Sequence, residues 1–193
     1  MLISEILTKN PTIGSYHYEV LRTQCDEFLI QSHGDPLYKA LPVTYNDFHR
    51  VKVRQQKSKD LISEAFNNAF KTEFYNIRQR AVFSLPTIPQ VDENTESFFI
   101  FPTNGFKFLY SKEVKNSSGD YQEVINTLVE QFDDPSTAID LLTDIVKYTY
   151  TQDSLTEAIS SNSEIILYGI PSYYAIKCSA VPSYNHIIKY IKI

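Results

Sequence analysis

Three polar residues stand at the ends of expected strands and could act together on a bound ligand. Arg54 ends an early strand, Ser111 ends a central aromatic strand, and Glu164 opens a late apolar strand. An arginine binds phosphate through two parallel hydrogen bonds. A carboxylate places fixed negative charge where positive charge develops in a transition state. These residue types therefore suit a site that holds phosphates and stabilises a cationic transition state.

The order of these three residues resembles the Arg, Ser, Glu arrangement of mono-ADP-ribosyltransferases. NSEIILYGIPSYYAI also looks like the strand that carries the catalytic glutamate of that family. The resemblance implies that Arg54 binds the phosphates of NAD, that Ser111 orients the nicotinamide ribose, and that Glu164 stabilises an oxocarbenium-like transition state. It further implies that Arg50 and Tyr110 belong to the cofactor-binding residues.

The chain departs from that family's pattern at two places. Asn162 stands where the family usually has Glu or Gln, two residues before the catalytic glutamate, and LYSKEV stands where its serine strand usually reads STS. The alternative is that Glu164 merely starts a strand and Ser111 merely ends one. On that alternative, neither residue is catalytic.

Motifs for other common chemistries are absent from the sequence. No P-loop, GxGxxG, HExxH, GxSxG or calcium-loop pattern occurs, which argues against the common nucleotide hydrolases, dinucleotide oxidoreductases and zinc proteases. The four histidines and two cysteines lack the spacing of zinc or iron–sulfur ligands. We therefore expect no metal site.

The densest run of charge is basic and comprises Arg50, Lys52, Arg54, Lys57 and Lys59. In a strand, the first three would share one face while the valines between them occupy the other. Such a face can grip the phosphates of nucleic acid or of a dinucleotide. Alternatively, the segment is a solvated edge strand whose charges protect it from aggregation.

Much of the chain also resembles uncharacterised proteins of large contractile-tailed bacteriophages. The stretches that carry this resemblance are LPVTYNDFHRVKVR, IRQRAVFS, FIFPTNGFKFLYSKEVKNSSGDY and EIILYGIPSYYAIK. The resemblance implies a phage gene product that acts in the infected bacterial cell or is packaged in the particle. Its partner would be a host or phage protein.

Composition is typical of a folded protein that stays where it is made. The chain has 193 residues, of which 42% are apolar and 21% charged, so we expect one domain spanning residues 1–193. Its net charge of −5 argues against a wholly basic surface. We expect no signal peptide, no membrane contact and a cytoplasmic location, with packaging in the virion as an alternative.

Apolar periodicity predicts an α+β fold in which helices pack on a largely antiparallel sheet. Spacings of three and four predict helices within residues 1–32, 59–80, 117–132 and 155–159, and another helix that begins at Pro135 and includes Val146. Alternating or continuous apolar runs predict strands near residues 48–54, 80–85, 97–114 and 164–178. The final residues, YNHIIKYIKI, are expected to form a last strand or a short helix.

Short signals also predict turns and a helix start. Gly34, Pro36 and Pro42 mark HGDPLYKALP as a turn-rich passage that breaks regular structure. Ser118 or Asp120 is the expected N-cap of the helix at 117–132. A bend from Gly169 to Pro171 is expected to divide the late apolar run into two strands.

Asn104 and Gly105 separate the apolar runs SFFIFP and FKFLYSKEV, which predicts a β-hairpin. Both faces of this hairpin would be apolar, so both must be covered, either by the chain's own helices or by a partner.

Three functions follow from these patterns. The first is a phage ADP-ribosyltransferase-like protein that uses NAD to modify a host macromolecule. The second is a non-catalytic virion or host-protein-binding protein whose contact surfaces are the aromatic hairpin and the basic strand. The third is a small nucleic-acid-binding factor that uses Arg50, Lys52 and Arg54.

Overall fold

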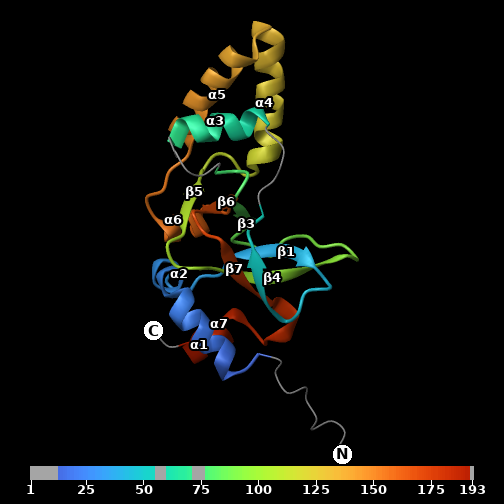
Figure 1. Cartoon of the computed structure of the whole chain (residues 1–193), viewed down its shortest axis with the longest axis vertical. Helices are drawn as coiled ribbons and strands as arrows, with labels where there is room; N and C mark the ends of the chain where they lie inside the picture. Colours follow the sequence, from blue (N-terminus) through green and yellow to red (C-terminus); the bar gives the residue numbers. More distant parts are fainter. Residues whose placement is uncertain (1–12, 55–59, 71–76, 192–193) are drawn as a thin grey trace, which may run out of the picture.

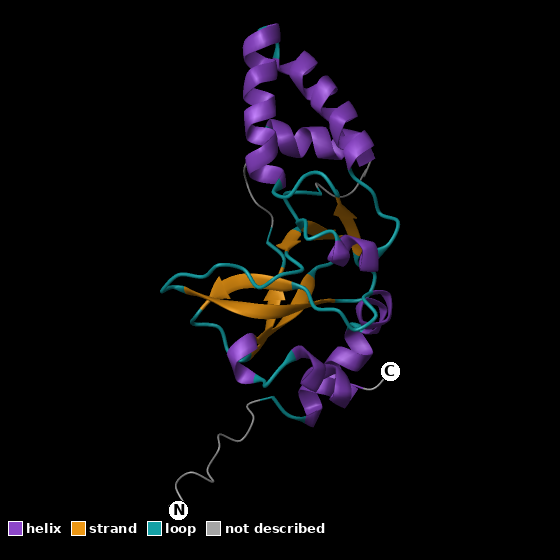
Figure 2. Ribbon diagram, turned by 180° about the vertical axis from the view of Figure 1, so that it is seen from behind, coloured by secondary structure: helices purple, strands orange, loops and turns teal. Residues whose placement is uncertain are grey.

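The computed structural model describes residues 13–54, 60–70 and 77–191. These residues form two small antiparallel sheets with helices at both ends of the molecule (Figures 1 and 2), which confirms the predicted α+β class. The helix expected around residues 2–7 lies outside the described residues.

The first sheet has four strands in the order β1-β4-β7-β2, and the second has three in the order β3-β6-β5. All of the paired strands run antiparallel. The strands are β1 (Tyr38–Pro42), β2 (Phe48–Lys52), β3 (Val82–Ser84), β4 (Thr95–Pro102), β5 (Lys107–Tyr110), β6 (Ile165–Tyr168) and β7 (Ser172–Lys177).

One long pair of bent strands joins the two sheets. Pro102 pairs with Tyr173 in the first sheet, and Lys107 pairs with Tyr168 in the second. The register is the same in both sheets, so β4 continues into β5 and β6 continues into β7 across a bend. Gly105 and Gly169 supply the bend, with φ of 81° and 80°, a conformation that glycine adopts without strain.

The predicted hairpin at Asn104 and Gly105 is therefore wrong. β4 pairs with β1 and β7, whereas β5 pairs with β6. Contacts with the N-terminal helices hold the connection in place, because the backbone N–H of Asn104 donates to the carbonyl of Gln24 and that of Gly105 donates to the Glu27 carboxylate. Asn-Gly favours positive φ, which serves a bend as well as a hairpin turn.

Strand β1 falls in a stretch that the sequence marked as a turn. Pro36 precedes it and Pro42 is its last residue. Proline is tolerated there because β1 is an edge strand, whose outer side needs no N–H donor.

Helices lie at both ends of the molecule and beside the sheets. They are α1 (Ser15–Gln24), α2 (Asp26–Gln31), α3 (Leu61–Phe70), α4 (Ser117–Phe132), α5 (Pro135–Thr149), α6 (Leu155–Ser160) and α7 (Tyr184–Ile191), with a 3-10 turn at Cys178–Ala180. Figure 1 shows α4 and α5 extending away from the sheets with α3 across their base, while α1 and α7 lie at the opposite end.

Side-chain caps fix where the two long helices begin. Asn116 accepts hydrogen bonds from the backbone N–H groups of Ser118 and Gly119 and caps α4, so the predicted cap at Ser118 or Asp120 is wrong. Asp134 caps α5 in the same way, with Pro135 in the first turn. Residues 77–80 form a turn, so the helix predicted to reach residue 80 does not do so.

The second sheet lies between two hydrophobic cores. Phe108 and Ile165 face a core shared with the first sheet, whereas Leu109 and Ile166 face a core built with α3, α4 and α5. The chain's own elements thus cover both faces of the aromatic run, and the proposed aromatic contact surface is not available to a partner.

Candidate functional site

The structure brings Ser111 and Glu164 together. Tyr110 pairs with Ile165 in antiparallel orientation. Ser111, which follows Tyr110, and Glu164, which precedes Ile165, therefore lie at the same end of the β5–β6 pair. Ser111 is fully buried, and its hydroxyl accepts hydrogen bonds from the backbone N–H groups of Glu113 and Val114, both at 3.1 Å. This hydroxyl stabilises the turn that follows β5.

The carboxylate of Glu164 binds the first residue of α4. It accepts a 3.1 Å hydrogen bond from the backbone N–H of Ser117 and another from the Ser117 hydroxyl. The Ser117 hydroxyl in turn accepts a 2.8 Å hydrogen bond from Arg78. Glu164 therefore ties the start of β6 to the N-terminus of α4.

Arg78 completes this cluster from the turn at residues 77–80. It is 7% exposed and donates a second hydrogen bond to Ser118 at 2.7 Å. Its guanidinium lies 5.3 Å from the ring centroids of both Phe66 and Phe83. Burial lowers the pKa of Arg78, an effect that the nearby carboxylates of Asp60 and Glu164 oppose.

The backbone N–H groups at the N-terminus of α4 are already hydrogen-bonded and cannot bind a phosphate. The Asn116 side chain accepts from the N–H groups of Ser118 and Gly119, and the Glu164 carboxylate accepts from that of Ser117. Asp120 accepts from the N–H groups of Lys115 and Asn116 just before the helix. Since the chain's own oxygens occupy these donors, this cluster stabilises the fold.

Arg54 lies on the other sheet. It follows β2, whose Lys52 pairs with Ser172 at the start of β7, and the N–H of Val53 donates to the carbonyl of Pro171. Arg54 is thus beside the bend, whereas Glu164 precedes the far end of β6. At strand rise, the five residue steps from Glu164 to Gly169 at the bend span roughly 16 Å. The structure does not bring Arg54 to Ser111 and Glu164.

The basic strand has the predicted alternation. Arg50, Lys52 and Arg54 are exposed, whereas Val51 and Val53 are partly buried. β2 is an edge strand, and Arg50 donates to the hydroxyl of Ser172 at 3.1 Å while its guanidinium lies 5.7 Å from the ring centroid of Tyr174. The predicted extension of this charge through Lys57 and Lys59 lies outside the described residues.

Tyr110, the remaining residue assigned to NAD, is fully buried and belongs to the core between the two sheets. Its hydroxyl donates to Glu157 at 3.4 Å, and burial raises its pKa. Its ring therefore offers no face to a ligand from solvent.

The described part of the chain holds no group of three or more His, Cys, Asp and Glu residues that could bind a metal. Within the same residues, no helix is long and apolar enough to cross a bilayer. Cys25 is buried, and burial raises the pKa of its thiol, which makes it a poor nucleophile.

Comparisons with known proteins give no family. No family model, curated protein or solved structure matches this chain. Function must therefore be argued from the site itself.

The strongest charge asymmetry lies in the arm formed by α4 and α5. Residues 117–149 contain one basic residue, Lys147, and seven acidic ones, a formal charge of −6 in a chain whose total is −5. The acidic residues are Asp120, Glu123, Glu130, Asp133, Asp134, Asp140 and Asp144. The arm is thus an acidic surface on an otherwise nearly neutral body.

Exposed apolar side chains run along α5. Tyr148 is 86% exposed, and Leu141 and Ile145 are 38% and 37% exposed. Their spacing of four and three residues places them in one stripe on the helix, and Asp144 and Asp140 follow along one side of it. Apolar side chains gathered in this way on a helix that extends from the body are typical of a contact surface.

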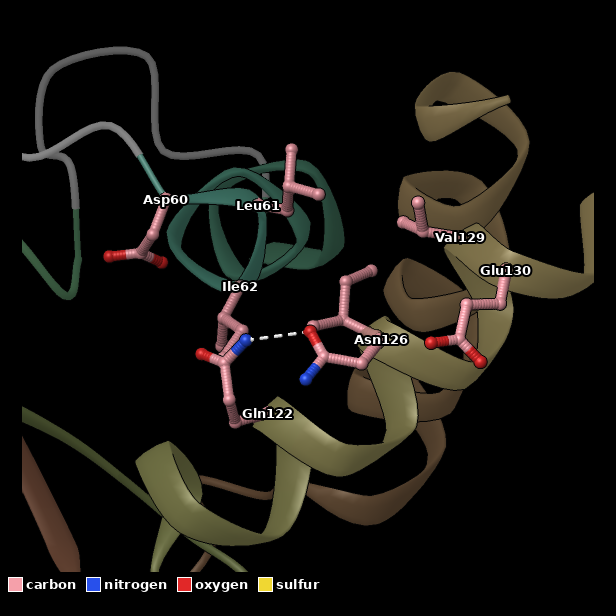
Figure 3. A pocket seen from close by; sticks show the side chains of 8 residues that line it. Asp60, Leu61, Ile62, Gln122, Asn126, Val129 and Glu130 are labelled. Atoms are coloured by element: carbon pink, nitrogen blue, oxygen red, sulfur yellow. Dashed lines mark hydrogen bonds between the residues drawn. The ribbon is translucent and has the colours of Figure 1, made fainter. Parts of the chain in front are cut away.

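A pocket of about 420 Å³ opens between the start of α3 and the middle of α4 (Figure 3). Leu61, Ile62, Ile125 and Val129 supply apolar walls, while Gln122, Asn126, Glu130 and Asp60 supply polar atoms. Among the residues that the structure describes, none that lines this pocket is basic.

Our sequence interpretation missed both the stripe and the pocket. Counting charge by segment would have identified the acidic arm, since seven of the chain's 23 acidic residues fall within 117–149. The pocket had no comparable signal, because it depends on how α3 lies against α4.

Proposed function

We propose that the chain is a non-catalytic phage protein that binds a host or phage protein through the arm formed by α4 and α5. The exposed stripe of Leu141, Ile145 and Tyr148 carries this proposal. Anchors at i, i+4 and i+7 are the pattern with which an amphipathic helix docks into an apolar groove of another protein.

Charge indicates the kind of partner. The stripe lies beside Asp140 and Asp144 on an arm of formal charge −6, so a groove with a basic rim fits it. A second copy of this chain fits poorly, because two acidic arms would repel each other. The phage origin rests on the resemblance of the four sequence stretches quoted above.

The other two functions have less support from the geometry. The side-chain oxygens of Ser111 and Glu164 accept hydrogen bonds from donors of their own chain. Arg54 lies near the opposite end of β6. A nucleic-acid-binding role would rest on three exposed cations, and the acidic arm would repel the phosphates.

The test begins with a display library of small folded domains that present apolar grooves, selected on the wild-type protein. We expect the grooves of the selected domains to have basic rims, and we expect Tyr148→Ala to weaken their binding at least about tenfold, as at a central aromatic anchor. Tyr16→Ala is the matched control, since Tyr16 is 73% exposed but lies on α1 at the other end of the molecule.

A result in which Tyr16→Ala and Tyr148→Ala weaken binding equally would overturn the proposal, as would selection of domains whose grooves have acidic rims. Incubation of the wild type with labelled NAD and bacterial lysate provides an independent test. Transfer of label that Glu164→Ala abolishes without unfolding the protein would favour the transferase instead.

A further inference from the structure

We infer that the pocket between α3 and α4 is a socket for one lysine or arginine side chain of the protein partner. This inference rests on the proposed function and deepens it, because it names the residue that the partner must present. The pocket is partly open to solvent, so a side chain can enter it.

The apolar walls suit the stem of such a side chain. Leu61 and Ile62 line the pocket from α3, and Ile125 and Val129 line it from α4. Lysine and arginine carry three or four methylene groups below the charge and cover apolar surface with them. A bare metal ion or a phosphate would leave these walls unused.

The polar atoms suit the charged end. Gln122, Asn126 and Glu130 follow one another at intervals of four residues and so form a row along α4. Gln122 donates to the amide oxygen of Asn126 at 3.0 Å, which leaves its own amide oxygen as an acceptor. In Figure 3 the Glu130 carboxylate lies beside Asn126.

Glu130 is available to a cation. Among residues 13–54, 60–70 and 77–191, its carboxylate has no hydrogen-bond or ion-pair partner within the structure, and it is exposed. The other acidic residue, Asp60, already accepts a 2.6 Å hydrogen bond from the backbone N–H of Ser63 and caps α3. Glu130 is therefore the residue that pairs with the incoming charge.

The probe is Nα-acetyl-lysine methylamide, compared with Nα-acetyl-norleucine methylamide, which has a similar stem without the charge. In an NMR titration of the full chain, we expect the lysine probe to shift the amide signals of residues 60–62 and 122–130. We expect the norleucine probe to bind at least about fivefold more weakly, because it offers no partner for Glu130.

Variants identify the residue responsible. Glu130→Gln should weaken the binding of the lysine probe at least about fivefold and leave the affinity for the norleucine probe unchanged. Glu123→Gln is the matched control, because it removes the same charge from the same helix at an exposed position that does not line the pocket. Circular dichroism confirms that both variants keep the helical content of the wild type.

Three results would overturn the inference. Equal binding of both probes would show an apolar pocket without charge selection, and equal effects of Glu123→Gln and Glu130→Gln would show diffuse attraction. Binding of free putrescine a hundredfold tighter than the lysine probe would identify a small diamine as the ligand. Tyr148→Ala leaves the lysine probe unaffected, so a failure of the stripe and a failure of the socket are separable.

Discussion

Glu164→Ala tests whether this carboxylate serves the fold or a reaction. The change removes the acceptor for the backbone N–H and the hydroxyl of Ser117, a residue that is fully buried. It also removes one of the two carboxylates, Asp60 and Glu164, that favour the charged form of Arg78. The N-terminus of α4 would lose its connection to β6.

The cost follows from the number of donors left without a partner. A buried donor without an acceptor costs about 1–3 kcal/mol. Because Glu164 is only half-buried and water can replace part of the interaction, we expect a loss of about 2 kcal/mol in the free energy of unfolding. For a chain of this length, this lowers Tm by roughly 4–8 °C. Glu164→Gln keeps one acceptor, so we expect about half of that loss.

Thermal unfolding followed by circular dichroism, together with urea titration, measures the effect. Glu19→Ala is the control, since Glu19 forms an exposed ion pair with Arg22 at 2.8 Å and its loss should move Tm by no more than about 1 °C. An unchanged Tm for Glu164→Ala, combined with loss of NAD-dependent labelling, would refute the structural role.

Three further expectations concern the bend, a thiol and the basic strand. Gly169→Ala should cost about 1–2 kcal/mol in unfolding free energy, because φ is 80° there and alanine is strained in that region; a neutral result in urea titration would argue against the bend. Burial raises the pKa of the Cys178 thiol from 9.0 to about 11. The stability that this thiol contributes is therefore fully present below pH 9 and is lost as pH rises through 11. Rapid alkylation of Cys178 in the native protein at pH 8 would contradict its burial. In gel shifts at two ionic strengths, the wild type should not retard single-stranded DNA; retardation that falls with salt and is abolished in Lys52→Ala/Arg54→Ala would restore the nucleic-acid alternative.

Local sequence signals predicted the helices well. α4 spans Ser117–Phe132, as predicted for residues 117–132, and α5 begins at the predicted Pro135, although the cap of α4 is Asn116. The bend between β6 and β7 was also predicted, because Gly169 and Pro171 interrupt an apolar run. Each of these features depends on residues only a few positions apart, which is why a sequence displays them.

Pairing between distant strands could not be predicted in the same way. The Asn104 and Gly105 dipeptide permits a hairpin, but it permits a bend equally well, and the partners of β4 lie in β1 and β7. Strand β1 was not predicted because Pro36 and Pro42 suggested a turn. Proline disrupts a central strand but is tolerated in an edge strand such as β1.

The bend between the two sheets also explains why the three predicted site residues do not lie together. Strand order along the chain placed Arg54, Ser111 and Glu164 at strand ends, and all three are found there. Arg54, however, is held beside the start of β7 by the pairing of β2, and Glu164 begins β6 on the far side of the bend. Two residues from one strand pair converge, and the third does not, because it belongs to the other sheet.

The same bend determines which surface is left for a partner. It turns the second sheet so that one face packs on the first core and the other on α3, α4 and α5, which buries the aromatic side chains of β4 and β5. The helices that close the second core present their outer faces to solvent and carry a formal charge of −6 over residues 117–149. Since the aromatic strands are used inside the fold, the exposed stripe of α5 and the pocket beside α4 are the surfaces on which binding can be tested.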